Sequence, residues 1–153
     1  MSHPPRLMVA ALMLAVAASQ PHPLWAQAPA TKAAAGGPVY VATYWRARPG
    51  KLADYSAYIT GTAEPIDEDA RRTGAFIEVR TVLATTTPNG PAPDWTHLRI
   101  FTLADMDAVG ALSAALDAAT SRVVPDEAQR KANSARAAEM RDLVRREVWT
   151  TLR

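Results

Sequence analysis

Stretches with strand-like and helix-like patterning alternate along the chain after residue 38. Residues 39–46 are β-branched and aromatic, which is typical of a strand. Residues 51–60 carry apolar side chains three or four positions apart, as on one face of a helix. A second short helix is predicted from Glu64, because Pro65 suits a first helical turn and the acidic residues that follow suit the positive end of the helix dipole.

Two further strands and an amphipathic helix follow. Residues 75–83 and 94–103 alternate with a period of two, and the loop between them holds the turn signal Pro-Asn-Gly-Pro. Asp105 is a natural N-cap, and apolar residues recur every three or four positions after it. This segment is therefore predicted to be a helix that buries one face.

The end of the chain completes the pattern. An alanine-rich helix is predicted to run from Pro125 toward Leu143, and residues 144–152 are interpreted as a fourth strand, although their apolar residues also fit a helical stripe. The order strand–helix–strand–strand–helix–strand, with an extra helix in each half, is that of the ferredoxin-like split βαβ fold. We therefore predict one α+β domain over residues 39–153, with a four-stranded antiparallel sheet and helices on one of its faces.

The opening of this domain resembles a known superfamily. Residues 44–55, Tyr-Trp-Arg-Ala-Arg-Pro-Gly-Lys-Leu-Ala-Asp-Tyr, are similar to the strand–Pro-Gly–helix start of dimeric α/β-barrel proteins, which include antibiotic-biosynthesis-monooxygenase-like domains. Residues 94–105, a strand running into an acid-capped helix, resemble the second half of that fold. The resemblance implies a homodimer whose two sheets face one another and, for an enzyme, a cofactor-independent oxygenase or isomerase. It transfers no catalytic residue, because members of such a fold differ in chemistry.

The first 28 residues read as an export signal. Arg6 precedes an apolar run over residues 7–18, which is too short to span a bilayer core of roughly 30 Å, and residues 26–28 offer an A-x-A cleavage site. An N-terminal membrane anchor is the alternative. We predict a signal peptide over residues 1–28, a flexible tail rich in alanine and glycine over residues 29–38, and a periplasmic or secreted protein with no stable membrane anchor.

Charge and cysteine content narrow the functional classes. The chain has 17 basic and 15 acidic residues, and the basic ones are scattered without a Lys/Arg run, which argues against a nucleic-acid partner. The chain has no cysteine. An exported domain without disulfides must be held by packing or by oligomerisation alone, so self-association is expected.

The strand at residues 94–103 holds the candidate chemistry. Read with a period of two, Trp95, His97, Arg99 and Phe101 share one side, and the other side is largely aliphatic. Charged groups seldom lie under cover without partners, because desolvation costs several kcal/mol unless it is compensated. A half-buried polar cavity would explain an imidazole and a guanidinium set between aromatic rings.

We expect the helices to cover the more aliphatic face, with Leu98 and Ile100, and a polar cavity to form on the opposite face against a partner subunit. Such a cavity would bind a small aromatic or anionic molecule. The predicted ligand-binding residues are Tyr44, Glu78, Arg80, Trp95, Glu147 and Trp149.

His97 and Arg99 are the candidate catalytic residues. His97 is the only histidine after residue 28, and imidazole is the natural proton shuttle near neutral pH. Arg99 with Arg80 would stabilise a carboxylate or an enolate oxygen. Alternatively, His97 is hydrogen-bonded within a dimer interface, and the two arginines pair with Glu78 and Glu147 inside the sheet.

No metal site and no cofactor is predicted. The acidic run at residues 67–69 lacks the spacing of an EF-hand loop and fits a solvated helix start. The chain has no G-x-S-x-G, P-loop, Rossmann glycine set or H-E-x-x-H. Three interpretations remain: an exported homodimer that binds a small molecule, a non-catalytic structural or stress-related envelope dimer, and a haem-binding protein that uses His97. Whether residues 64–72 act as a lid stays open.

Overall fold

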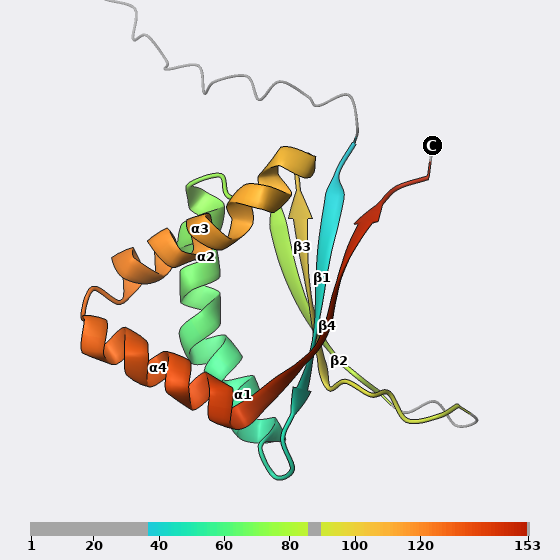
Figure 1. The fold of residues 1–153 in the computed structure, drawn as a ribbon, viewed down its shortest axis with the longest axis vertical. Helices are drawn as coiled ribbons and strands as arrows, with labels where there is room; N and C mark the ends of the chain where they lie inside the picture. Colours follow the sequence, from blue (N-terminus) through green and yellow to red (C-terminus); the bar gives the residue numbers. More distant parts are fainter. Residues whose placement is uncertain (1–36, 86–89, 153) are drawn as a thin grey trace, which may run out of the picture. The chain divides into compact units, whose positions relative to one another are not determined.

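A computed structural model describes residues 37–85 and 90–152 of the chain. The predicted signal peptide, residues 1–28, and the predicted tail up to residue 36 lie outside the described residues. Within the described part, a sheet forms one layer and the helices lie on one side of it (Figure 1). No helix of this part is both long and apolar enough to cross a membrane.

Four strands make up the sheet, and every neighbouring pair is antiparallel. Their order is β2-β3-β1-β4, which is the ferredoxin-like topology, so the predicted fold class is confirmed. The strands are β1 (Val39–Ala47), β2 (Glu78–Leu83), β3 (His97–Leu103) and β4 (Arg141–Thr150).

The helices form the second layer. The first one continues through a π-helical turn into the next without a break, because the residues at both junctions keep right-handed helical angles. Asp105 caps the third helix as predicted, since its carboxylate accepts a hydrogen bond of 2.9 Å from the Ala108 amide. The helical elements are α1 (Leu52–Tyr58), η1 (Ile59–Ala63), α2 (Glu64–Arg72), α3 (Met106–Val123) and α4 (Glu127–Met140).

The last helix and the last strand meet with no residue between them. The fourth strand is confirmed, but it begins at Arg141, three residues before the predicted start at residue 144, and α4 ends at Met140. A register shift between Tyr44 and Trp45 lets β4 stay paired with β1 as far as Ala47. This extension carries Arg141 onto the sheet.

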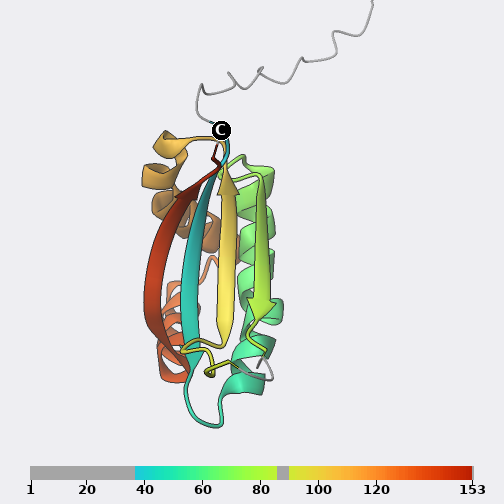
Figure 2. The same cartoon turned by 90° about the vertical axis from the view of Figure 1, so that its right-hand side faces the viewer.

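The face of β3 that the helices cover is the opposite of the predicted one. Pairing with β1 places His97, Arg99 and Phe101 on the side of Val41, and Phe101 packs into the core beneath the helices. The aliphatic residues Leu98 and Ile100 instead lie on the other face, which no described helix covers and which we call the open face (Figure 2). For β2 the expectation is correct, because Val79 packs against the helix-side core.

A core of aliphatic and aromatic side chains fixes the helical layer to the sheet. Leu103 and Ala119 are fully buried in it, and the rings of Phe76 and Phe101 meet edge to face at 5.1 Å. Ala70 of α2 is also fully buried there. Residues 64–72 therefore belong to the packed layer.

Candidate ligand-binding site

The residues proposed as one site lie on two sides of the sheet. His97 and Arg99 face the helices, and the register of the strands puts Glu78, Arg80, Tyr44 and Glu147 on the open face. Trp95 and Trp149 join this second group, since their rings lie 5.6 Å and 6.5 Å from the ring of Tyr44. The sheet therefore separates the candidate catalytic residues from the candidate ligand-binding residues.

His97 is enclosed beneath α1. Only 1% of it is exposed, its Nε2 lies 3.1 Å from the Ser56 hydroxyl, and its Nδ1 lies 2.9 Å from the Thr96 hydroxyl. The ring also meets the ring of Tyr55 edge to face at 4.4 Å. Both ring nitrogens are thus occupied by neighbours within the chain.

The surroundings of His97 favour its neutral form. Burial, with a contribution from the charge of Arg141, lowers the pKa of His97 below the usual value. The Ser56 hydroxyl also donates to the Leu52 carbonyl at 2.9 Å, so it accepts most readily from an Nε2–H. His97 does not line the cavity described below, and ligation of a haem iron would require Nε2 to give up Ser56. Its role as an acid–base group stays a prediction.

Arg99 forms a buried ion pair with Asp67 of α2. The side chains are 11% and 6% exposed, and Arg99 Nη2 donates to the Asp67 carboxylate. The partner is neither Glu78 nor Glu147, the residues considered from the sequence, because Arg99 points to the helices and those acids to the open face. Burial raises the pKa of Asp67 to about 6, although Arg99 opposes the rise.

The charged groups of the open face are paired with one another. Arg80 forms an ion pair with Glu78 at 2.7 Å, which is one of the alternatives predicted from the sequence. Glu147 accepts hydrogen bonds from Arg145 at 2.8 Å, from the Trp149 indole at 2.9 Å and from the Tyr44 hydroxyl at 3.3 Å. The bonds from Arg145 and Trp149 lower the pKa of Glu147. These carboxylates and guanidinium groups therefore need no external ligand.

A hollow of about 410 Å³ lies on the open face, where the cavity was predicted. Three of the predicted ligand-binding residues, Glu78, Arg80 and Trp149, line it. Its lining is Tyr40, Glu78, Arg80, Ile100, Thr102 and Trp149.

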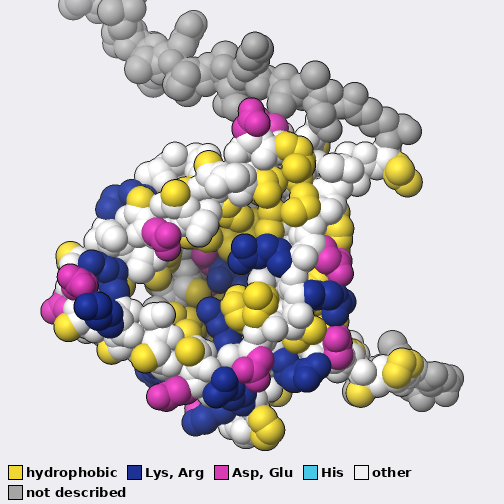
Figure 3. All heavy atoms as spheres, viewed as in Figure 1, with side chains coloured by type: hydrophobic (Ala, Val, Ile, Leu, Met, Phe, Trp, Pro, Cys, Tyr) yellow, Lys and Arg dark blue, Asp and Glu magenta, His cyan; other side chains and the backbone are white. Residues whose placement is uncertain are grey.

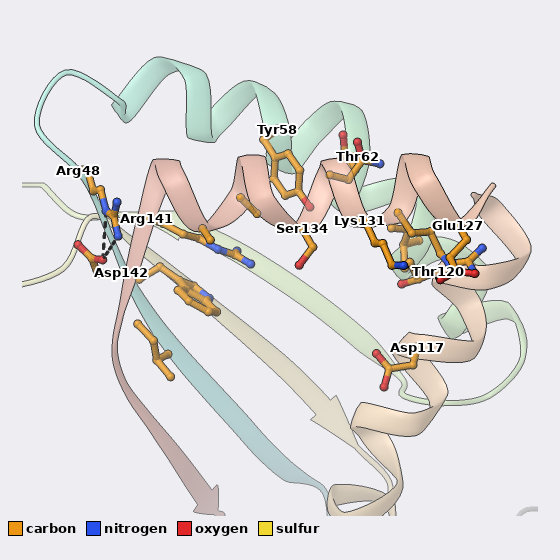
Figure 4. A pocket seen from close by; sticks show the side chains of 17 residues that line it. Arg48, Tyr58, Thr62, Asp117, Thr120, Glu127, Lys131, Ser134, Arg141 and Asp142 are labelled. Atoms are coloured by element: carbon orange, nitrogen blue, oxygen red, sulfur yellow. Dashed lines mark hydrogen bonds and ion pairs between the residues drawn. The ribbon is translucent and has the colours of Figure 1, made fainter. Parts of the chain in front are cut away.

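A larger cavity, of about 920 Å³, lies on the helix side of the sheet. Its volume is at the upper end of the range of about 300–1,000 Å³ that is typical of small-molecule sites. Figure 3 shows the hollow between the helices and the strands, with basic side chains at its wall. In Figure 4, Arg141, Tyr58 and Ser134 point into the same space from the sheet, α1 and α4 respectively.

Two arginines of this cavity belong to none of the ion pairs among the described residues. Arg130 Nη1 donates to the Val124 and Pro125 carbonyls at 2.8 and 2.7 Å, and the second arginine, Arg141, lies against aromatic rings. Its guanidinium carbon lies 3.8 Å from the centroid of the Trp45 ring, and its Nη1 donates to the Tyr55 hydroxyl at 2.6 Å. Among the described residues it takes part in none of the ion pairs, whereas Arg48 and Lys131, which also line the cavity, are paired with Asp142 and Glu127 at 2.9 Å each. Arg141 therefore has donors that no acidic side chain of the described part occupies.

Neither Trp45 nor Arg141 is among the site residues predicted from the sequence. Trp45 was visible as an aromatic residue of the first strand, on the face opposite Tyr44, and its position beside the buried Val41 was the available signal. Arg141 lay inside the predicted last helix, so its place on the sheet was hidden by the wrong helix end. Among the described residues, no group of three or more acidic, histidine or cysteine side chains is arranged to hold a metal ion.

No protein-family model matches the chain, and no curated protein matches it either. Similar solved structures exist. An EthD-like protein from Ralstonia eutropha JMP134 is 15% identical, with a TM-score of 0.49 over 75% of this chain and 92% of that one. SnoaB, a cofactor-independent oxygenase from Streptomyces nogalater, is 11% identical, with a TM-score of 0.46 over 76% and 95% of the two chains.

A third similar structure is a dimeric protein of unknown function and ferredoxin-like fold from Bacteroides fragilis NCTC 9343. It is 12% identical, with a TM-score of 0.43 over 75% of this chain and 97% of that one. At TM-scores below 0.5 these likenesses carry no argument about activity, so the proposals below rest on the residues of this chain. The strand order shows the ferredoxin-like fold, so the predicted resemblance is confirmed at the level of the fold.

Proposed function

We propose that the protein is a homodimer that binds a small anionic molecule with an aromatic part in the cavity between its helices and its sheet. The observation that carries this proposal is Arg141, whose guanidinium lies over the Trp45 ring on the cavity wall without an acidic partner in the described part. The proposal is one of binding and includes no chemical step.

The geometry of Arg141 suits a carboxylate or a similar planar anion. A guanidinium offers five N–H donors in a fixed fork, which matches the two oxygens of a carboxylate. Stacking on Trp45 and the hydrogen bond to Tyr55 hold the fork in place, so little side-chain entropy is lost when an anion binds. The Tyr58 ring, which lines the same space, offers an aromatic face to the rest of the molecule.

The open face supports self-association through the sheet. Val82 and Trp149 are 42% and 37% exposed there, beside the partly buried Ile100, and no described helix covers them. Glu78 and Glu147 on this face are already paired with Arg80 and Arg145, so a second copy can cover these pairs without leaving either carboxylate alone. The same pairing suits the alternative of a purely structural dimer, which differs in having an unoccupied cavity.

The binding proposal is tested with benzoate, a small aromatic carboxylate, and its neutral amide, benzamide, in a calorimetric titration. We expect benzoate to bind and Arg141→Gln to weaken it by about tenfold or more, since a hydrogen bond to a charged group contributes roughly 1.5–3 kcal/mol. Benzamide should bind more weakly than benzoate to the unchanged protein and equally to both proteins.

Arg136→Gln is the matched control for Arg141→Gln. Arg136 lies on the exposed side of α4 and does not line the cavity, so the variant removes the same charge from another place. It should bind benzoate as the unchanged protein does. Equal weakening by both variants, or no binding of benzoate at millimolar concentration, would overturn the proposed site.

We also propose that residues 1–28 direct export and are removed. The support is Arg6 followed by the apolar run at residues 7–18 and the A-x-A sequence at residues 26–28. N-terminal sequencing of the protein recovered from a periplasmic or culture-medium fraction should begin at Pro29 or within a few residues of it. Soluble protein that retains Met1 would contradict the proposal.

A further inference from the structure

We infer that the anionic ligand carries an apolar tail, and that this tail lies in a groove between α3 and the β1–β4 part of the sheet. The inference rests on the proposed function, because it extends the same site. It assigns the ligand to the class of elongated amphipathic acids, in which the acid group and an alkyl or similarly apolar tail lie at opposite ends.

The groove is a second cavity of about 130 Å³ on the helix side of the sheet. An engineered apolar cavity of about 150 Å³ is large enough to bind benzene, so a groove of this size accepts a short alkyl chain. The buried Thr43 and the exposed Ser113 and Arg146 complete its lining. Its apolar walls are Val41, Phe101, Val109, Leu112, Leu116 and Val148.

The groove adjoins the Arg141 cavity along three elements. On β1, Thr43 belongs to the groove and Trp45, the next residue on that face, belongs to the cavity. On α3, Leu116 lines the groove and its neighbour Asp117 lines the cavity. On β4, Arg146 and Val148 line the groove, and Arg141 and Leu143 on the same face line the cavity. One extended molecule that occupies both would lie along the Thr43–Trp45 segment of β1 and beside Leu116 of α3.

The dimensions fix the length of the ligand. Val41 and Trp45 are four residues apart on one strand, which corresponds to about 13 Å at roughly 3.3 Å per residue. An acid group on Arg141 would thus place a tail of that reach beside Val41 and Val148. Val148 is 45% exposed on this face of β4, and an apolar tail would cover it.

The inference is tested by comparing benzoate with para-hexylbenzoate, which adds an alkyl chain opposite the acid. Each fully buried methylene contributes about 0.8 kcal/mol, so even a partly buried chain should tighten binding to the unchanged protein by about thirtyfold or more. Arg141→Gln should weaken both acids by the same factor, because the head contacts are shared.

Ser113→Trp is designed to fill the groove from its rim without removing a core residue. It should bring para-hexylbenzoate down to the affinity of benzoate and leave benzoate itself unchanged, which also shows that the variant is folded. Ala114→Trp is the matched control, because Ala114 is exposed on α3 and does not line the groove. It should preserve the gain from the alkyl chain.

The outcomes separate the two proposals. If benzoate binds through Arg141 but the hexyl chain adds nothing, or adds an affinity that Ser113→Trp leaves intact, the apolar tail site is wrong and the proposed function stands. If neither acid binds in a manner that depends on Arg141, the proposed function is overturned and the inference with it.

Discussion

Arg99→Ala is expected to lower the free energy of unfolding by about 3–5 kcal/mol, because it leaves the Asp67 carboxyl buried without its partner. Only 6% of the Asp67 side chain is exposed, so bulk water solvates its carboxylate poorly once the guanidinium is lost. For a domain of this size the midpoint of thermal unfolding at neutral pH should fall by about 10 °C or more. Differential scanning calorimetry measures both quantities.

The effect of Arg99→Ala should depend on pH. The pKa of Asp67 is about 6 in the folded protein and about 4 in an unfolded chain. Between these two pH values the folded state binds more protons than the unfolded state. The free energy of unfolding therefore falls as the pH rises through this window. Removal of Arg99 raises the folded pKa further, because Arg99 opposes the rise. The loss should therefore be largest at neutral pH and shrink as the pH falls toward 5.

Two further variants identify the cause. Arg71→Ala removes an arginine from the exposed pair with Glu68 on α2, and it should leave the midpoint unchanged. The double variant Arg99→Met with Asp67→Leu should recover most of the stability that Arg99→Ala loses, since apolar side chains can replace a buried pair. A midpoint that Arg99→Ala leaves within experimental error would show that the pair is not buried in solution.

Ile100→Lys is expected to convert the proposed dimer into a monomer. Ile100 lies in the middle of the open face, paired across the strands with Ala42 and Arg80, so each copy would bring an additional unpaired cation to the interface. A cost of about 3 kcal/mol corresponds to a loss of dimer affinity of roughly a hundredfold. Light scattering at micromolar concentration should give the dimer mass for the unchanged chain and the monomer mass for the variant.

Ala135→Lys is the control for this prediction. Ala135 is exposed on α4, on the helix side of the molecule, and a lysine there should leave the dimer intact. Circular dichroism should show that the Ile100→Lys monomer keeps its fold, because Ile100 lies outside the helix-side core. A monomer mass for the unchanged chain would contradict the dimer itself.

The element order was predictable because each segment carries its own local signal. The caps, the prolines in first turns and the change between periods of two and of about 3.6 residues act over a few neighbours, and they led to the correct fold class. The start of β4 was not predictable in this way. It depends on a register shift in β1, which is a property of the pairing between distant strands.

The face of β3 was mistaken because sequence alone does not show which helix residues complement a polar strand. Asp67 and Ser56 supply the partners of Arg99 and His97, and both lie in helical segments that read as amphipathic or solvated. The aliphatic side of β3 was assigned to the helix-covered core because only that face was expected to carry apolar side chains. The open face carries apolar side chains as well, and Leu98 and Ile100 are among them.

Because α4 runs directly into Arg141 at the start of β4, local opening of α4 affects how a ligand enters and leaves the cavity. Only Ala137 and Met140 of α4 are buried, whereas α3 adds the partly buried Ala108, Val109 and Leu116 to its two buried residues, so α4 is held less firmly than α3. Segments with few buried contacts open locally at a smaller free-energy cost than the global unfolding. A ligand that bridges α4 and Arg141 would suppress this opening, so the affinity of the site and the amide-exchange protection of α4 should rise and fall together.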